Sequence, residues 1–344
     1  MRSIVVTGGL GFLGQYVTEA LRRAYPGTRV KIAARGHRPF IVPGIEGDGR
    51  VEIEYGTELS DADGLARRFE GADAVVHAAA EVSFLTRDRE RLLEANATGT
   101  RNVVDACARS GVRRLLHVSS TAALGYSDDP ERPADETLRY DWRKARGFAY
   151  MLSKRLAETE ALGALAHGLD VVVANPSSIY GPGDPRAWPL FEAVAGGKLP
   201  ALMPCGFAVV DVRDAASGIA LVLGKGVRGE RYLLTGGNHT YTGLMASIAR
   251  AVGTEAPRRT LPRWLGPPLS AAAGLAERLA SGTPRLSREL VAPGFRWRYF
   301  SSAKAERELG WRPVRDIDET MRDSIAYWRA AGGTAGDIFG GAKS

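Results

Sequence analysis

Cysteine is scarce in this chain of 344 residues, which contains only Cys107 and Cys205. The first lies in a stretch with helical periodicity and the second in a predicted loop, and neither belongs to a cluster with metal-ligand spacing. The sequence therefore predicts no disulfide framework and no metal site.

Long hydrophobic runs are also absent. No run reaches the roughly eighteen apolar residues that a membrane-spanning helix needs, so we expect no membrane span. Residues 1–3 lead directly into a predicted strand, which leaves no room for a secretory signal. Together with a composition that is 44% hydrophobic and 25% charged, these absences predict an ordinary globular protein of the cytoplasm.

Acidic residues are in the minority. The chain has 46 lysines and arginines against 39 aspartates and glutamates, which gives a formal charge of +7 and an isoelectric point near 9.5. The arginines are scattered through helical stretches, and no long basic run or recognition motif accompanies them, so nucleic acid is not an expected partner. A phosphate-bearing cofactor or an acidic group on a small-molecule substrate accounts for the excess equally well.

The N-terminus carries a pattern of strand, glycine turn and helix. A short apolar run at 4–6 leads into T-G-G-L-G-F-L-G at 7–14, and apolar residues then recur at helical spacing. Gly8, Gly11 and Gly14 fit G-x-x-G-x-x-G. Without Cβ atoms they permit a tight turn and let backbone N–H groups approach a pyrophosphate at the positive end of the helix. This segment predicts a dinucleotide site; the alternative is a plain glycine-rich turn.

Strands and helices continue to alternate along the chain. Residues 72–80 read as a buried strand that ends in small residues, 96–104 begin a helix, and 114–118 form a strand followed by Ser119 and Ser120. This alternation predicts an α/β fold with a Rossmann-type, doubly wound parallel sheet, in which ligands bind beyond the carboxyl ends of the strands. Either serine can instead simply cap or turn the chain.

The second predicted strand, at 30–34, indicates which dinucleotide is bound. It ends at Arg35, where an acidic residue would hold the adenosine ribose of NAD. Arg35 and the nearby Arg38 instead offer guanidinium groups suited to a 2′-phosphate. We therefore expect NADP(H) rather than NAD(H), and a solvated basic turn is the alternative.

Tyr150 and Lys154 stand four residues apart in a segment with helical periodicity. Positions i and i+4 lie on one helix face with Cβ atoms roughly 5–6 Å apart. A lysine at that distance is expected to lower the pKa of the tyrosine from its usual value near 10, so that the phenol can exchange a proton near neutral pH. This is the requirement for a general acid.

Read in order, these segments resemble the extended short-chain dehydrogenases/reductases, nearest the branch of dihydroflavonol-reductase-like and 3β-hydroxysteroid-dehydrogenase-like proteins. The resemblance rests on the following segments: T-G-G-L-G-F-L-G at 7–14, H-A-A-A at 77–80, N-A-T-G-T at 96–100, H-V-S-S-T at 117–121, Y-M-L-S-K at 150–154, N-P-S-S-I-Y-G-P-G-D at 175–184, V-V-D-V-R-D at 209–214 and K-A-E-R-E-L-G-W-R-P at 304–313. They cover nearly all of residues 1–330.

The resemblance implies a site. Ser120, Tyr150 and Lys154 would be catalytic, and Lys154 would also hold the nicotinamide ribose. Hydride would move between the nicotinamide and a carbonyl or carbinol carbon while Tyr150 supplies or removes the proton on oxygen. The residues expected at the cofactor are Gly8, Gly11, Phe12, Leu13, Gly14, Arg35, Arg38, Ala78, Ala79, Ala80, Asn96, Ser119, Tyr150, Lys154, Pro176 and Ile179.

The resemblance also implies an organisation. We expect residues 1–175 to form the cofactor-binding core and 176–331 a smaller, mostly helical substrate lobe whose strands and helices return to that core. The glycine-rich residues 332–344 are expected to be a flexible tail. Relatives of this kind suggest a homodimer packed through the helices that begin near Asn96 and Tyr150.

The substrate is the open question. Sugar-nucleotide relatives commonly place an arginine where this chain has Phe207, which favours a small or medium, largely apolar ketone, aldehyde or β-keto compound. Arg186 or Arg213 can supply the missing charge, so a sugar-nucleotide 4-epimerase or 4-ketoreductase is the alternative. A non-catalytic sensor of NADP(H) is a third hypothesis. The aromatic residues Trp188, Trp264, Phe295, Trp297 and Tyr299 either line the substrate cleft or belong to the core.

Overall fold

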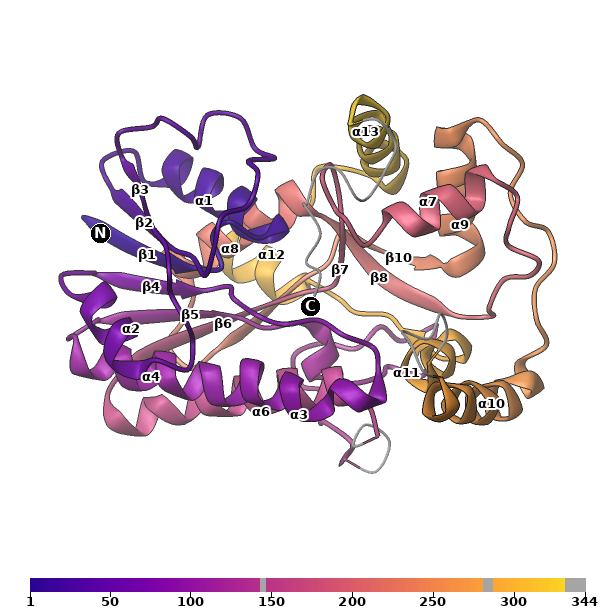
Figure 1. Cartoon of the computed structure of the whole chain (residues 1–344), viewed down its shortest axis with the longest axis horizontal. Helices are drawn as coiled ribbons and strands as arrows, with labels where there is room; N and C mark the ends of the chain where they lie inside the picture. The colour runs from indigo at the N-terminus through magenta and orange to yellow at the C-terminus, as the bar shows by residue number, and fades with distance from the viewer. Residues whose placement is uncertain (143–146, 281–286, 332–344) are drawn as a thin grey trace.

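A sheet of parallel strands runs through the larger lobe of the computed structural model, which describes residues 1–142, 147–280 and 287–331 (Figure 1). Its order is β3-β2-β1-β4-β5-β6-β9. The strands are β1 (Ser3–Thr7), β2 (Arg29–Ala33), β3 (Val51–Glu54), β4 (Ala74–His77), β5 (Arg114–Val118), β6 (Asp170–Pro176) and β9 (Arg231–Leu234). The order reverses at β1 and β4, so the edge beyond these strands is the ligand-binding side of a doubly wound sheet. The predicted Rossmann-type fold is confirmed.

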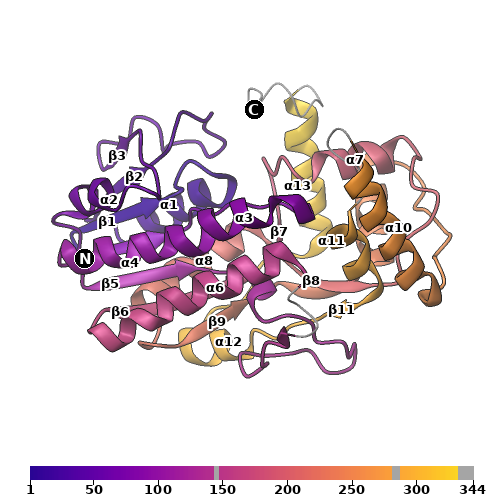
Figure 2. The same cartoon turned by 60° about the horizontal axis from the view of Figure 1, so that its bottom comes forward.

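Helices cover both faces of this sheet (Figures 1 and 2). One face is covered by α1 (Phe12–Ala24), α8 (Val212–Lys225) and α12 (Ala303–Leu309). The other is covered by α2 (Ala62–Phe69), α4 (Gly99–Arg109) and α6 (Ala149–Gly163). The short α3 (Arg89–Leu92) and a π-helical turn at Leu93–Thr98 lead into α4.

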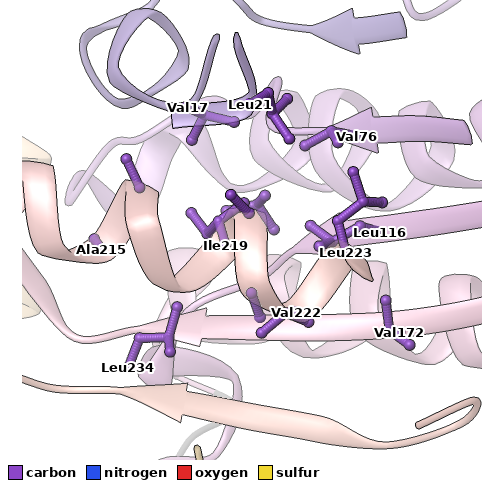
Figure 3. Packing of buried hydrophobic residues seen from close by; sticks show 14 of the residues in the cluster. Val17, Leu21, Val76, Leu116, Val172, Ala215, Ile219, Val222, Leu223 and Leu234 are labelled. Atoms are coloured by element: carbon purple, nitrogen blue, oxygen red, sulfur yellow. The ribbon is translucent and has the colours of Figure 1, made fainter. Parts of the chain in front are cut away.

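The two faces are built from alternate residues of each strand. In β1, Ile4 and Val6 point to the α1 and α8 side, whereas Val5 points to the α2 and α4 side, because side chains alternate along a strand. Figure 3 shows Ile219 and Leu223 of α8 packed toward α1 and the strands. Burying each such side chain contributes about 1.5–3 kcal/mol. This packing holds the carboxyl ends of the strands at one fixed edge.

The smaller lobe combines a second sheet with helices. Its strands are β7 (Ser178–Tyr180), β8 (Gly206–Asp211), β10 (Gly237–Thr240) and β11 (Trp297–Arg298), with β8 paired to the other three. Its helices are α7 (Trp188–Ala195), α9 (Tyr241–Val252), α10 (Gly266–Leu279), α11 (Arg288–Val291) and α13 (Ile317–Ala330). The second half of the chain also contributes α8, β9 and α12 to the larger lobe. The predicted tail at 332–344 lies outside the described residues.

Two findings limit the kinds of site present in the described ranges. Cys107 and Cys205 are both buried, unpaired thiols. Among the described residues no group of three or more histidine, cysteine, aspartate or glutamate side chains is arranged to hold a metal ion. In the same ranges, no helix combines the length and apolar character that a bilayer crossing requires.

Candidate active site

The glycine turn after β1 is tightly packed against the loop after β4. Gly8 has a φ of 72°, and a Cβ atom there would lie 2.6 Å from Ala79 Cα. A Cβ on Gly14 would overlap the carbonyl of Gly8. Both positions therefore require glycine, Gly8 for its left-handed backbone and close approach and Gly14 for close helix packing.

The turn leads into the amino end of α1, which has the features of an anion site. Gly11 is the N-cap and provides no side-chain cap, so it leaves the first amides of the helix, around Phe12 and Leu13, without a side-chain acceptor. The first turn contains no acidic residue. A helix amino end with free N–H groups and positive dipole fits the pyrophosphate of a dinucleotide.

The small residues after β4 lie beside this turn. Ala78 and Ala79 are partly exposed and Ala80 is exposed, which leaves their backbone accessible at the sheet edge. Asn96, in the π-helical turn, accepts a hydrogen bond from Glu81 N at 2.7 Å and donates to Ser153 Oγ at 3.0 Å. In this structure Asn96 therefore ties the loop of Ala78–Ala80 to α6, so it acts on the site by holding that loop in place.

Two arginines stand free at the carboxyl end of β2. Arg35 and Arg38 are both exposed, and within the described part of the chain no acidic side chain pairs with either. Between them, the His37 ring stacks on Tyr55 with centroids 3.9 Å apart. This arrangement fits the adenosine end of a cofactor that bears a 2′-phosphate.

Tyr150 and Ser120 meet beyond the carboxyl end of β5. Burial is the largest influence on Tyr150 and raises the pKa of its phenol above the ordinary value of 10.0, while the charge of Arg186 and a hydrogen bond with the Ser120 side chain lower it. The phenol is thus protonated at neutral pH. Phe84 packs edge-on against its ring, with centroids 5.6 Å apart.

The Lys154 side chain lies beneath these groups in the interior. It is 3% exposed, and its Nζ donates a hydrogen bond to the carbonyl of Val118 at 3.0 Å. Burial lowers the pKa of Lys154 to about 8, against the charge of Glu158, which raises it. The expectation that Lys154 lowers the pKa of Tyr150 was wrong, because burial of the phenol outweighs the neighbouring charges and Arg186 is the cation that acts on it.

Glu158 lies one turn beyond Lys154 on the side of α6 that carries Tyr150 and Lys154. It is fully buried, accepts a hydrogen bond from Asn175 Nδ2 at 2.7 Å and pairs with Arg231 at 3.1 Å. The same amide of Asn175 donates to the carbonyl of Ser120 at 3.1 Å. Sequence reasoning missed Glu158, although its spacing of four from Lys154 on the same face was the available signal.

Within the described part of the chain, two buried hydroxyls without hydrogen-bond partners lie just beyond the carboxyl ends of β5 and β6. Ser119 Oγ and Ser177 Oγ are buried without a hydrogen-bond partner among the described residues. Buried polar groups normally have hydrogen-bond partners, so these two hydroxyls fit groups that form their hydrogen bonds with a bound ligand. Pro176 ends β6 and Ile179 lies in β7, which places both at this edge. The sequence-predicted residues are therefore gathered at the ends of β1, β2, β4, β5 and β6.

The smaller lobe supplies a cap to the catalytic helix. Phe148, the N-cap of α6, makes no side-chain hydrogen bond. Glu289 of α11 takes that role: it is 4% exposed and accepts hydrogen bonds from Ala149 N at 2.7 Å and from Tyr150 N at 3.4 Å. Burial raises the pKa of Glu289, and these two N–H groups oppose that shift. No local sequence signal identifies this residue, because it lies 139 positions from Tyr150.

Replacing Glu289 by alanine is expected to lower kcat about 10-fold to 100-fold, because small displacements of a catalytic group have effects of that size. The affinity for the nicotinamide cofactor should change little, since the glycine turn before α1 and α11 lie in different lobes (Figure 1). Steady-state kinetics and fluorescence titration measure the two effects. Glu289→Gln retains one acceptor oxygen and should restore most of kcat. Equal losses in both variants, or none in either, would show that the cap does not position Tyr150.

The pH profile tests the environment of Lys154. As pH rises through about 8 the ammonium of Lys154 loses its proton, so kcat/KM for the nicotinamide cofactor, which reports the free enzyme, should fall through that range. Glu158→Gln removes the charge that raises this pKa and should move the fall to lower pH. Glu160→Gln, on the exposed side of the same helix, is the control and should leave the profile in place. A profile that is flat through pH 8 would contradict the assignment.

The fold and the site together define a class of protein. A glycine turn precedes the first helix at the point where the strand order of the doubly wound sheet reverses. A tyrosine and a lysine lie four residues apart on one helix, beyond the ends of the neighbouring strands. This is an oxidoreductase of the short-chain dehydrogenase/reductase type. The sequence profile described as the NAD dependent epimerase/dehydratase family matches residues 4–235, so the chain belongs to that family.

Comparison with individual proteins agrees with this placement. A Synechocystis sp. protein provisionally named dihydroflavonol 4-reductase is 33% identical, over 95% of this chain and 94% of the relative. An Arabidopsis thaliana 3beta-hydroxysteroid-dehydrogenase/decarboxylase is 30% identical, over 96% of this chain and 81% of the relative. The predicted family and branch are confirmed.

A solved structure is similar over the whole chain. The dTDP-glucose 4,6-dehydratase DesIV from Streptomyces venezuelae, crystallised as a double mutant with NAD and DAU, has 26% identity and a TM-score of 0.76, with 97% of this chain and 98% of that one covered. The present chain has a glycine turn, an amino end of α1 without a side-chain cap, and the unpartnered hydroxyls of Ser119 and Ser177, and these groups fit such a dinucleotide. The family therefore indicates a nicotinamide dinucleotide as cofactor.

Proposed function

We propose that this protein is an NADP(H)-dependent reductase of small to medium, largely apolar ketones, aldehydes or β-keto compounds, able to run in reverse as an alcohol dehydrogenase. The observation that carries the proposal is the state of Tyr150. Its phenol lies beside Ser120 at the sheet edge where the cofactor site opens, and burial raises its pKa above the ordinary value. A protonated phenol is ready to donate, which is the role that carbonyl reduction requires.

Different residues of the chain bind the cofactor, orient the substrate and transfer the proton. The glycine turn and the amino end of α1 hold the cofactor's pyrophosphate, and Arg35 and Arg38 hold its 2′-phosphate. When bound, NADPH supplies the hydride. Ser120 orients the substrate oxygen by a hydrogen bond, and Tyr150 transfers its proton to that oxygen. The positive charge of Arg186, which lowers the pKa of the phenol, stabilises the phenolate that remains, and Lys154 would hold the nicotinamide ribose.

An apolar substrate is favoured by the surroundings of Tyr150. Phe84 presents its ring to the phenol, and among the described side chains Phe84 is one of the few large apolar groups with more than a third of its surface exposed. The two sequence relatives described above carry names that refer to a flavonoid and to steroids. Flat, apolar carbonyl compounds of this kind suit an aromatic wall.

One observation keeps the sugar-nucleotide alternative open. Phe207 occupies the position expected to carry a diphosphate-binding arginine, yet the guanidinium of Arg298 in β11 lies over its ring, 5.4 Å from the centroid. Of the two arginines expected to supply this charge, Arg213 is paired with both Asp211 and Asp323, and Arg186 is paired with Asp184 at 3.4 Å. A cation is therefore available beside Phe207, and the absence of arginine at that position does not exclude a diphosphate.

A non-catalytic sensor is the weakest alternative, because Ser120, Tyr150 and Lys154 are all retained and brought together. A homodimer remains a prediction. The expected interface helices α4 and α6 lie side by side on one face of the sheet and are joined by an ion pair between Arg101 and Glu160 at 2.6 Å (Figures 1 and 2). Analytical ultracentrifugation of the whole chain measures the oligomeric state.

The test of the proposed function is NADPH oxidation across a substrate panel. The panel contains apolar ketones, aldehydes, acyl thioesters bearing a β-keto group, and UDP- and dTDP-sugars. Turnover of the apolar carbonyl compounds is expected. Chromatography of the sugar nucleotides after incubation detects a 4-epimerase, which returns the hydride to its substrate and so oxidises no NADPH. Conversion of sugar nucleotides alone, in either assay, would replace the proposal by its alternative, and NADPH binding without conversion of any compound in both assays would favour the sensor.

A further inference from the structure

The segment of α10 and α11 has the reverse of the usual polarity of a surface helix. Its acidic side chains point inward: Glu277 accepts hydrogen bonds from the backbone and hydroxyl of Thr86, and Glu289 caps α6. On α10 the buried residues are Gly266, Ala273 and Glu277. An amphipathic helix that served only to cover a core would bury its leucines and expose its carboxylates.

The apolar side chains of this segment point to solvent instead. Trp264 is 72% exposed, Leu275 is 58% exposed and Leu279 is 77% exposed. Five of the eleven exposed large apolar side chains in the described part of the molecule lie in this segment: Trp264, Leu269, Leu275, Leu279 and Leu290. At 100° per residue, the exposed positions of α10 form one continuous arc with leucines near its centre. We name these five residues the α10–α11 face.

Arginines are the charged groups at the border of this face. Arg263, Arg278 and Arg288 are all exposed, and they line the same cavity as Leu275. Between Ala256 and Ala280 the sole acidic residue is the buried Glu277. Arg263 donates to the carbonyls of Pro204 and Phe295, so it keeps its full positive charge.

The face adjoins a cavity of about 900 Å³ between α10, α11 and the turn at Thr86. Leu275 and Arg278 belong both to the exposed side of α10 and to the wall of this cavity. In Figures 1 and 2, α10 lies at the outer edge of the smaller lobe, so the described part of the molecule leaves its outward side open. The apolar face, the arginine border and the cavity form one continuous surface.

We propose that the α10–α11 face docks on the surface of an anionic lipid bilayer. The tryptophan and leucines of the face can insert between the acyl chains, and the arginines at its border can contact the anionic head groups above them. A second copy of this chain fits less well, because a twofold contact through this face would place arginines against arginines. The docking is peripheral, and it goes beyond the proposed reductase activity and does not depend on it.

Co-sedimentation of the full chain with vesicles tests the docking. Vesicles of phosphatidylglycerol and phosphatidylcholine in equal parts should bind the protein, and vesicles of phosphatidylcholine alone should bind it much less. Added salt should weaken the binding, because it screens the arginines. The double variant Leu275→Ser, Leu279→Ser should reduce the partition coefficient at least about 10-fold, since it removes two of the five apolar side chains of the face. Arg278→Glu with Arg288→Glu should reduce it similarly.

Matched controls lie elsewhere on the surface. Val314→Ser is the apolar control, at a side chain that is 81% exposed and outside the face, and Arg312→Glu is the charge control. Neither should change vesicle binding. Unchanged thermal melting and NADPH affinity of the double variants would show that they remain folded.

Absence of binding to anionic vesicles, or binding that the face variants leave unchanged, would overturn the proposal. If the wild-type chain self-associates without binding vesicles and the leucine variant is monomeric, the face is a protein interface and the proposal is wrong. Because turnover is measured without vesicles, failure of the docking and failure of the proposed reductase activity are separate results.

Discussion

Tyr150→Phe is expected to lower kcat by about 10³-fold while the affinity for NADPH changes less than about threefold, because a positioned general acid contributes roughly 10²–10⁴ to the rate. The phenol oxygen is the only part of the side chain removed, so the packing against Phe84 is kept. Single-turnover kinetics with the best carbonyl substrate measures the chemical step, and fluorescence titration measures cofactor binding.

Tyr140→Phe is the matched control for this variant. Tyr140 is also buried, and its hydroxyl has no hydrogen-bond partner among the described residues, so its loss should leave turnover near the wild-type value. Undiminished activity in Tyr150→Phe would remove Tyr150 as the proton donor. A parallel loss of NADPH affinity would instead indicate that the substitution damages the cofactor site.

Arg35→Asp is expected to reverse the preference between the two dinucleotides. Hydrogen bonds to charged groups contribute about 1.5–3 kcal/mol each, so the ratio of kcat/KM for NADPH to that for NADH should fall by about 100-fold. The new carboxylate repels a 2′-phosphate and can accept hydrogen bonds from the ribose hydroxyls of NAD. Initial rates with each cofactor at a fixed, saturating substrate concentration give this ratio.

Arg29→Asp makes the same charge change at the first residue of β2, at the opposite end of the strand from Arg35. It should leave the cofactor ratio unchanged, which separates a local contact from a general effect of net charge. An unchanged ratio in Arg35→Asp would mean that the 2′-phosphate is held by other groups, with Arg38 the next to test. A wild-type preference for NADH would contradict the assignment directly.

Local features of the site were predictable from the sequence because their chemistry depends on near neighbours in the chain. The glycine turn, the strand ends at Ser119 and Ser120, and the spacing of Tyr150 and Lys154 each occupy a few consecutive residues. Periodicity then indicates strand or helix, and parallel strands bring their carboxyl ends to one edge. The family followed from the order of these segments, and the comparisons confirmed it.

The groups that support the site were harder to predict because their partners are distant in the chain. Glu158 lay within reach of a spacing argument, but its role depends on Asn175 and Arg231 in neighbouring strands. Glu289 gave no signal at all, since a helix cap from another lobe has no fixed spacing. The second sheet was also missed, because its strands are short and separated by long helices.

Electrostatics were the least predictable property. The spacing of Tyr150 and Lys154 suggested a lowered pKa for the phenol, whereas burial raises it. Phe207 suggested a missing cation, whereas pairing of β8 with β11 brings Arg298 over its ring. In both cases the outcome depends on solvent exposure and on charges from other elements, which only the folded chain defines.

The sequence by itself determined the fold class, the family, the glycine turn and the helical spacing of Tyr150 and Lys154, because these depend on local patterns that any chain with the same spacing repeats. Only the tertiary structure decided that Glu289 caps the catalytic helix, that Arg298 lies beside Phe207, and that α10 turns its leucines outward. Each of these depends on contacts between residues far apart in the chain, or on which side of a helix the rest of the molecule leaves uncovered. Those quantities arise from packing and cannot be read from spacing alone.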